Sequence, residues 1–317
     1  MIQSGTTFGA DDEKVRENTD LSSEYFLNSQ LTNMIEPDVL HFKSLSPHGF
    51  HRVVYRQWGN PLNSRVVVCV HGLTRNGRDF DELATTLADR FRVLCPDMPG
   101  RGDSEWLPDA RDYIFPTYLT TLTALLAHAD VNRCAWVGTS MGGLLGMILA
   151  AQRSTPVVRL VLNDVGPVIE AAALARIGTY VGMDPRFSSF SALAAHVRSV
   201  SAPFGPLNDA QWEKLARTSA REVGDGDWRL SYDPGIAVPF RVESKEATNL
   251  WPLWDMITCP TLLLRGADSD LLSRATADAM HARGPRPEVI EFTGTGHAPA
   301  LVSDEQIAPV AAFVEPL

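Results

Sequence analysis

The chain has 317 residues, of which 44% are hydrophobic and 21% charged, and its formal net charge is −10. These proportions are typical of a globular protein with a sizeable core, and the length allows one large domain with an insertion, or two domains. No run of Lys and Arg interrupts this acidic chain, so neither nucleic acid nor an anionic membrane surface is an expected partner.

The sequence contains no stretch of about 18 apolar residues, the length that a membrane span needs. Residues 1–20 are polar and acidic without an apolar centre, so no signal peptide is predicted and the expected location is cytoplasmic. The four cysteines stand singly, without the spacing of a metal site, which favours free thiols in a reducing compartment; they are Cys69, Cys95, Cys134 and Cys259.

Residues 1–35 are polar and predict an N-terminal arm. Beyond them, strands are predicted where apolar residues alternate or run together, and helices where they recur every three or four residues. In this first half the predicted strands are residues 52–58, 66–70, 93–95, 134–137 and 157–162, and the predicted helices lie around residues 80–91, 118–126 and 144–151.

The alternation of strand and helix lapses between residues 168 and 247. That segment contains helix-like stretches at 192–200 and 210–222 but no clear buried strand. The pattern predicts an α/β fold: a doubly wound, mostly parallel sheet in residues 36–167 and 248–317, with an inserted helical cap in residues 168–247. In the last part the predicted strands are 261–266 and 288–292, with a helix at about 273–283 and a final helix opened by a capping box at Ser303-Asp304-Glu305-Gln306.

The stretch Gly138-Thr139-Ser140-Met141-Gly142-Gly143 follows an apolar strand and precedes an apolar helix. A Gly-x-Ser-x-Gly turn in that setting is typical of a nucleophile elbow, which raises the serine hydroxyl above the sheet edge. Glycine is needed on both sides of the serine because a side chain there would collide with the neighbouring strand and helix. Ser140 is therefore the predicted nucleophile, the alternative being a structural turn with an unused serine.

A nucleophilic serine needs a base, and the base needs a carboxylate that orients it. Ligands of an α/β sheet bind beyond the C-terminal ends of the strands, so the candidates are residues that follow strands. His297, in a glycine-rich loop after the last predicted strand, is the predicted base. Position alone leaves three aspartates open as the acid: Asp268 and Asp270 after strand 261–266, and Asp164 after strand 157–162.

The segment His71-Gly72-Leu73 ends the strand at 66–70. Gly72 allows the backbone to turn sharply, so the Leu73 N–H can point into the site beside the Met141 N–H. These two donors form the predicted oxyanion hole, in which one donor is typically worth about 2.7–4 kcal/mol of transition-state stabilisation. His71 is predicted to brace this loop rather than to take part in catalysis.

Taken together, these segments resemble the α/β-hydrolase fold superfamily, in its serine hydrolase branch with a helical cap. The resemblance covers about residues 40–167 and 248–317, with the motifs in the family order serine, acid, histidine. Some bacterial members carry an Arg-Gly-x-x-Ser-Asp loop, and this resemblance places the acid at Asp270. The matching pieces are His71-Gly72, Asp97-x-x-Gly100-x-Gly102-x-Ser104, Gly138 to Gly143, Arg265 to Asp270, and Gly294-Thr295-Gly296-His297.

The resemblance implies a carboxylesterase-like enzyme that needs no cofactor and no metal. Ser140 would attack an ester carbonyl, His297 would transfer the protons, and water would release the acyl group. The same residues serve hydrolases that cut carbon–carbon bonds of vinylogous diketone acids, lactonases and acyltransferases, and some non-catalytic receptors share the fold. The expected partner is a small-molecule ester, and the sequence leaves the oligomeric state open.

Arg75 follows the predicted oxyanion loop closely. Pointing inward, it would bind a substrate carboxylate; the alternative is an arginine that faces solvent. The cap is rich in aromatic residues, of which one or two are expected to reach the pocket while the others form the cap's own core. These aromatic residues are Phe187, Phe190, Phe204, Trp212, Trp228, Tyr232 and Phe240.

Overall fold

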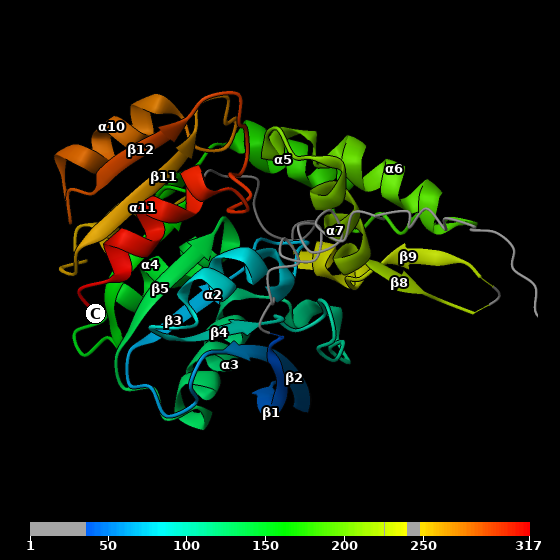
Figure 1. The fold of residues 1–317 in the computed structure, drawn as a ribbon, viewed down its shortest axis with the longest axis horizontal. Coiled ribbons are helices and arrows are strands. Elements are labelled where there is room, and N and C mark those ends of the chain that lie inside the picture. The colour runs from blue at the N-terminus through cyan, green and yellow to red at the C-terminus, as the bar shows by residue number, and fades with distance from the viewer. Residues whose placement is uncertain (1–35, 225, 240–247) are drawn as a thin grey trace, which may run out of the picture. The chain divides into compact units, whose positions relative to one another are not determined.

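The computed structural model describes residues 36–224, 226–239 and 248–317. The expected N-terminal arm, residues 1–35, lies outside the described residues. The core is an eight-stranded sheet in the order β1-β2-β4-β3-β5-β6-β11-β12 (Figure 1). Its strands are β1 (Asp38–Ser46), β2 (Gly49–Trp58), β3 (Val66–Val70), β4 (Arg92–Pro96), β5 (Cys134–Thr139), β6 (Val157–Asn163), β11 (Thr261–Gly266) and β12 (Glu288–Phe292).

The strands β4, β3, β5, β6, β11 and β12 run parallel, and β2 is antiparallel to both of its neighbours, β1 and β4. All five residues of β3 are buried, as a continuous apolar run predicts for a strand covered on both faces. Parallel strands place their carboxyl ends at the same edge of the sheet, so the loops that follow β3, β5, β6 and β12 meet there. The predicted α/β class with a mostly parallel sheet is confirmed.

Helices cover both faces of the sheet. Successive residues of a strand point to opposite faces, so Val66 and Val68 pack into one apolar cluster while Val67 and Cys69 pack into the other. The first cluster includes residues of α3 (Phe115–His128), α4 (Met141–Ala150), α9 (Trp251–Trp254) and α10 (Arg274–Ala282), and the second includes residues of α2 (Asp81–Leu87) and α11 (Asp304–Val314).

Between β6 and β11 the chain leaves the sheet and forms a separate set of elements, which we call the cap segment (residues 168–249). Two short strands at its ends, β7 and β10, pair antiparallel and close its base. Its helices and its β8–β9 hairpin lie together in Figure 1. The described elements are β7 (Val168–Ile169), α5 (Ala171–Tyr180), α6 (Phe190–Val200), η3 (Ala202–Phe204), α7 (Asp209–Ser219), β8 (Ala220–Glu222), β9 (Trp228–Leu230), η4 (Pro234–Ala237) and β10 (Thr248–Asn249).

Three details differ from the sequence prediction. Strand β1 was not predicted, because its buried positions are Phe42, Ser44 and Ser46, and two serines on that face hide the apolar alternation. The helix expected over 210–222 ends at Ser219, where the chain turns into β8. The capping box of α11 does not form: Ser303 makes no side-chain cap, and the side-chain Oε1 of Gln306 accepts from the Leu301 N–H instead.

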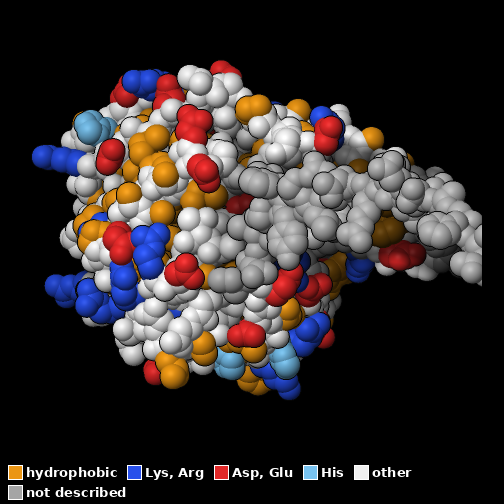
Figure 2. All heavy atoms as spheres, in the orientation of Figure 1, with side chains coloured by type: hydrophobic (Ala, Val, Ile, Leu, Met, Phe, Trp, Pro, Cys, Tyr) orange, Lys and Arg blue, Asp and Glu red, His pale blue; other side chains and the backbone are white. Residues whose placement is uncertain are grey.

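The four cysteines are free thiols, as predicted. None of the helices in the described part of the chain combines the length and the apolar character that crossing a membrane requires. On the face drawn in Figure 2, Lys and Arg side chains lie among Asp and Glu side chains.

Candidate active site

Ser140 occupies the tight turn between β5 and α4. Its backbone has φ 51° and ψ −115°, a conformation that costs a residue with a side chain about 1–3 kcal/mol. A Cβ atom on Gly138 would lie 2.4 Å from the Gly142 backbone, and one on Gly142 would lie 2.0 Å from the Val70 carbonyl oxygen. Both glycines are therefore required by the close approach of strand, turn and helix, as the elbow pattern predicts.

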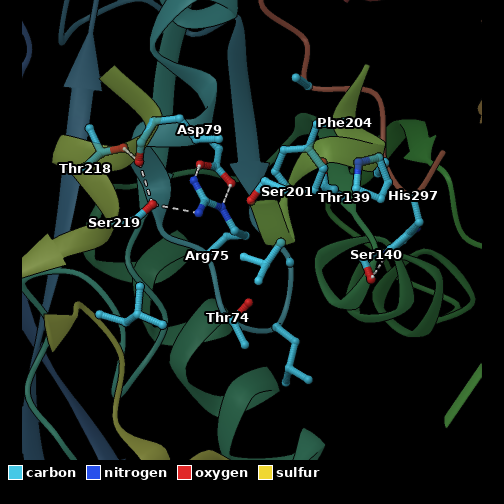
Figure 3. Close-up of a pocket in the computed structure, with 18 of the residues that line it drawn as sticks. Thr74, Arg75, Asp79, Thr139, Ser140, Ser201, Phe204, Thr218, Ser219 and His297 are labelled. Carbon is cyan, nitrogen blue, oxygen red and sulfur yellow. Dashed lines mark hydrogen bonds and ion pairs between the residues drawn. The ribbon is translucent and has the colours of Figure 1, made fainter. Parts of the chain in front are cut away.

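The structure brings Ser140 and His297 together. The distance from His297 Nε2 to Ser140 Oγ is 3.0 Å, and the pair lies at the wall of a cavity (Figure 3). On its other side, His297 Nδ1 lies 2.7 Å from Oδ2 of Asp164. A hydroxyl, an imidazole and a carboxylate connected in this way can move a proton from the hydroxyl to the ring while the carboxylate stabilises the imidazolium.

The carboxylate beside His297 is that of Asp164, and the prediction that Asp270 takes this place is wrong. Asp270 points away: its side chain is 54% exposed and pairs with Arg176 of α5. Asp268 does not reach the imidazole either; it is exposed, and its backbone N–H donates to the Thr295 carbonyl oxygen.

Asp164 is fully buried and accepts three hydrogen bonds. Its Oδ1 accepts from the Gly266 N–H at 2.9 Å, and its Oδ2 accepts from the Ser269 hydroxyl at 2.6 Å and from His297. The strands β6 and β11 are neighbours, so the loops after both strands reach the same histidine. The loop after β11 supplies Ser269 as a hydrogen-bond donor to the acid rather than the acid itself.

Sequence reasoning did not single out Asn163, which connects the elbow to the histidine loop. Its carbonyl oxygen accepts from the Ser140 N–H at 3.1 Å, and its amide donates to Thr139 Oγ1 and to the Pro299 carbonyl oxygen. The only sequence signal was its place at the end of β6, directly before Asp164.

His71 braces the loop after β3, as predicted. The Met98 N–H donates to its Nε2 at 2.9 Å, so the ring proton is on Nδ1 and is donated to the Gly72 carbonyl oxygen at 2.7 Å. Complete burial lowers the pKa of His71 to about 3, because a charged imidazole would lose its hydration there. His71 is thus a neutral connection between the oxyanion loop and the loop after β4.

The two predicted oxyanion donors belong to Leu73 and Met141. A Cβ atom on Gly72 would lie 3.6 Å from Ser140 Cβ, so the loop that carries Leu73 runs directly beside the serine. Met141 is the first residue of α4, where helix N–H groups have no partner within the helix. Neither N–H has a hydrogen-bond acceptor within the described part of the chain, so both are available to a ligand oxygen.

A cavity of about 1010 Å³ lies between the sheet edge and the cap segment. The sheet side contributes Ser140, His297 and Leu73. Of the cap aromatics, Phe204 and Tyr232 line the cavity, whereas Phe187, Phe190 and Trp228 pack around the cap's own core; Phe240 lies outside the described residues. The other apolar side chains that the cap contributes to the lining are Ile177, Tyr180, Met183, Pro185, Val200, Pro203, Leu207, Leu215 and Leu230.

Arg75 lines this cavity, but its charge is already compensated. Its guanidinium donates to both carboxylate oxygens of Asp79, at 2.9 and 2.6 Å, and to the Ser219 hydroxyl of the cap at 2.7 Å (Figure 3). The other Lys and Arg residues that line the cavity are paired as well, in the ion pairs Arg78–Asp81, Arg176–Asp270 and Lys214–Glu82. The Lys and Arg charges of the lining are therefore compensated, and they lie beside the apolar side chains of the cap segment.

Within residues 36–224, 226–239 and 248–317, no cluster of three or more His, Cys, Asp or Glu side chains is arranged to hold a metal ion. The chemistry described above uses only the hydroxyl, imidazole, carboxylate and backbone N–H groups of the chain.

Comparisons with known proteins bear on the fold and on the class of enzyme. A 3-hydroxybutyrate-oligomer hydrolase from Cupriavidus necator is 46% identical over 277 residues, which cover 85% of this chain and 94% of that protein. The crystal structure of an alpha/beta hydrolase from Novosphingobium aromaticivorans has a TM-score of 0.80 at 38% identity, covering 90% of this chain and all of that one. A putative hydrolase from Rickettsia typhi has a TM-score of 0.83 at 30% identity, covering 89% and 99% of the two chains.

The model of the alpha/beta hydrolase family matches residues 67–313, which include the elbow, the cap segment and the histidine loop. With this match and a relative of 46% identity along most of its length, the chain is a hydrolase and belongs to the alpha/beta hydrolase family.

Proposed function

We propose that this hydrolase cleaves carboxylic ester bonds through an acyl-enzyme on Ser140, with short oligomers of 3-hydroxybutyrate as substrates. The observation that carries the proposal is the hydrogen-bonded series Ser140–His297–Asp164 beside the free N–H groups of Leu73 and Met141. In this mechanism His297 takes the proton of the hydroxyl as Ser140 attacks the ester carbonyl. The two N–H groups then hold the oxyanion.

The second half of the reaction uses the same groups. His297, now protonated, gives its proton to the departing alkoxide, and the alcohol leaves. A water molecule then gives a proton to His297 and attacks the acyl carbonyl, and collapse of that intermediate returns the proton to Ser140. Asp164 stays ionised and stabilises the imidazolium in both halves.

The choice of substrate rests on the Cupriavidus necator relative and on the cavity. A volume of about 1010 Å³ lies at the upper end of the range of about 300–1,000 Å³ that is usual for small-molecule sites. A 3-hydroxybutyrate oligomer consists of compact, uncharged ester repeats with methyl branches. The apolar side chains and paired charges of the lining suit such a chain better than a multiply charged ligand.

The test is a panel of substrates: 3-hydroxybutyrate dimer and trimer, p-nitrophenyl esters from acetate to decanoate, a lactone and a vinylogous diketone acid. We expect turnover of the oligomers and short esters and a much smaller kcat/KM for the diketone acid. A preference for the diketone acid would assign carbon–carbon bond hydrolysis instead. Product analysis identifies the acyl acceptor. Transfer of the acyl group to an alcohol rather than to water would indicate an acyltransferase.

The sequence left open whether Arg75 binds a substrate carboxylate or faces solvent, and its present hydrogen bonds favour a limited contribution to substrate binding. Because Asp79 and Ser219 already accept three of its hydrogen bonds, Arg75→Gln should raise KM equally for a 3-hydroxybutyrate trimer and for its methyl ester. The comparison of the two KM values checks this directly. A rise confined to the free acid would restore the role of Arg75 as a carboxylate-binding residue.

A further inference from the structure

Arg101 lies in the loop after β4 and is fully buried. The acceptors of its guanidinium are two backbone carbonyls and a phenol. Nε donates to the Leu73 carbonyl oxygen at 2.8 Å, and Nη1 donates to the Pro99 carbonyl oxygen at 2.7 Å and to Tyr118 Oη at 2.8 Å. Nη2 is buried and has no partner within the described residues.

This arrangement is unusual, because a buried guanidinium loses its hydration and is normally compensated by a carboxylate. Arg56, on the neighbouring strand β2, shows the usual solution: it is also buried and pairs with Asp97 and Asp103. Arg101 instead lies over the rings of Tyr113 and Tyr118, with centroid distances of 5.5 and 5.0 Å. Its positive charge is therefore solvated by neutral groups.

The hydrogen bond to Leu73 connects this charge to the oxyanion loop. The loop is held on both sides of Leu73. The peptide that carries the Leu73 N–H is held at its Gly72 carbonyl oxygen, which accepts from His71 Nδ1, and the next peptide is held at the Leu73 carbonyl oxygen, which accepts from Arg101. Together the two hydrogen bonds restrain the backbone rotations at Leu73 that would turn its N–H. An oxyanion donor acts only when it is already aimed at the position that the charge will occupy.

The loop that carries Arg101 is also joined to the cap segment. The Gly102 N–H donates to the Ser231 carbonyl oxygen, and the Asp233 N–H donates to the Gly100 carbonyl oxygen, both at 2.8 Å. The backbone on both sides of Arg101 thus binds the cap segment, while the buried side chain of Arg101 binds the oxyanion loop.

We propose that Arg101 is a positioning residue for acyl transfer: its buried guanidinium restrains the backbone at Leu73, the residue that supplies one proposed oxyanion donor, and places beside that residue a positive charge that no carboxylate among the described residues pairs with. The inference rests on the function proposed above. It implies that loss of Arg101 weakens binding of the transition state and leaves binding of the substrate nearly unchanged, because the negative charge exists only in the transition state.

The experiment compares Arg101→Met and Arg101→Lys with the wild-type chain on p-nitrophenyl butyrate and on a trifluoromethyl ketone, an inhibitor that forms an oxyanion when serine adds to it. For Arg101→Met we expect kcat to fall by about 10- to 100-fold, KM to stay within about twofold, and Ki of the ketone to rise by the same factor as kcat falls. Arg101→Lys, which keeps the charge but has fewer donors, should lie between.

Arg56→Met is the matched control, since it removes a buried arginine from the neighbouring strand that does not contact Leu73. Both methionine variants are expected to lose stability, but only Arg101→Met should lose kcat and affinity for the ketone. If Arg101→Met does not fold, Tyr118→Phe removes one acceptor of the guanidinium and should lower kcat by a few-fold with KM unchanged.

An unchanged kcat in the Arg101 variants, or an equal fall in Arg56→Met, would overturn the inference. A fall in kcat with an unchanged Ki of the ketone would also overturn it. An effect that acts through the oxyanion must weaken binding of the ketone as well, whereas a structural effect need not. The proposed function fails separately, if the wild-type chain does not turn over the ester or does so without Ser140.

Discussion

Replacing Ser140 with alanine should abolish ester hydrolysis, with kcat lower by about 10⁴- to 10⁶-fold, because the remaining oxyanion donors and cavity accelerate the reaction far less than the complete series of groups. The variant should also lose labelling by a fluorophosphonate probe, which reacts with an activated serine. The measurements are steady-state turnover of the 3-hydroxybutyrate trimer and mass spectrometry of the labelled protein.

The protein should remain folded in this experiment. Alanine keeps the Cβ atom that the elbow accommodates at φ 51° and removes only the hydroxyl, whose one described partner is His297. Ser44→Ala is a suitable control: Ser44 is a buried serine on β1, its hydroxyl contacts Thr121, and it does not line the cavity. Turnover of Ser140→Ala comparable to that of Ser44→Ala would show that Ser140 is not the nucleophile.

Exchanging Asp164 for asparagine should lower kcat by about 10⁴-fold, as loss of the acid does in other triads. The amide can donate to His297 Nδ1. The imidazole would then carry its proton on Nε2, and Nε2 could not accept the proton of Ser140. This prediction is checked by kcat on p-nitrophenyl butyrate, with thermal unfolding measured in parallel because Asp164 also accepts from Gly266 and Ser269.

Asp270→Asn is the matched variant, with the same chemical change at a carboxylate that pairs with Arg176 at the surface. An exposed ion pair contributes about 0–1 kcal/mol, so kcat should stay within about fivefold of the wild-type value. If instead Asp270→Asn is the inactive variant and Asp164→Asn is active, the arrangement of the two loops after β6 and β11 must differ during turnover.

The candidate site was predictable where the chemistry depends on local sequence. Ser140 could be singled out as the candidate nucleophile because the elbow needs glycine at two fixed distances from this position, and a Cβ at Gly138 or Gly142 would collide with the backbone. His297 could be singled out as the candidate base because it follows the last strand of a parallel sheet, where functional residues gather.

The acid could not be chosen in the same way. Asp164 and Asp270 both follow strands that end at the same edge of the sheet, and β6 and β11 are hydrogen-bonded neighbours. Either carboxylate was compatible with the chain order. The choice depends on the direction of side chains in two loops: Asp164 points inward to the Gly266 N–H, while Ser269 turns its hydroxyl toward Asp164 and leaves Asp270 at the surface.

Whether the charge of an arginine is compensated also depends on the tertiary structure. The sequence shows that Arg75 lies near the predicted oxyanion loop, but it shows neither whether its charge is compensated nor that Arg101 reaches the same loop. The structure pairs Arg75 with Asp79 at the cavity wall and buries Arg101 among carbonyls and tyrosine rings. The pair Arg75–Asp79 is local, and the cap segment adds only Ser219 to it. Arg101, in contrast, is joined to Leu73 and Tyr118 from separate parts of the core.

The sequence by itself determined the alternation of strands and helices in the core from β2 onward, the mostly parallel sheet and the elbow, because apolar periodicity and glycine spacing act over a few residues. Tertiary structure alone decided that β1 extends the sheet with a partly polar buried face, that Asp164 holds His297, and that a buried Arg101 holds Leu73. Each of these depends on residues from distant parts of the chain meeting at one place, and no local pattern in the sequence encodes such a meeting.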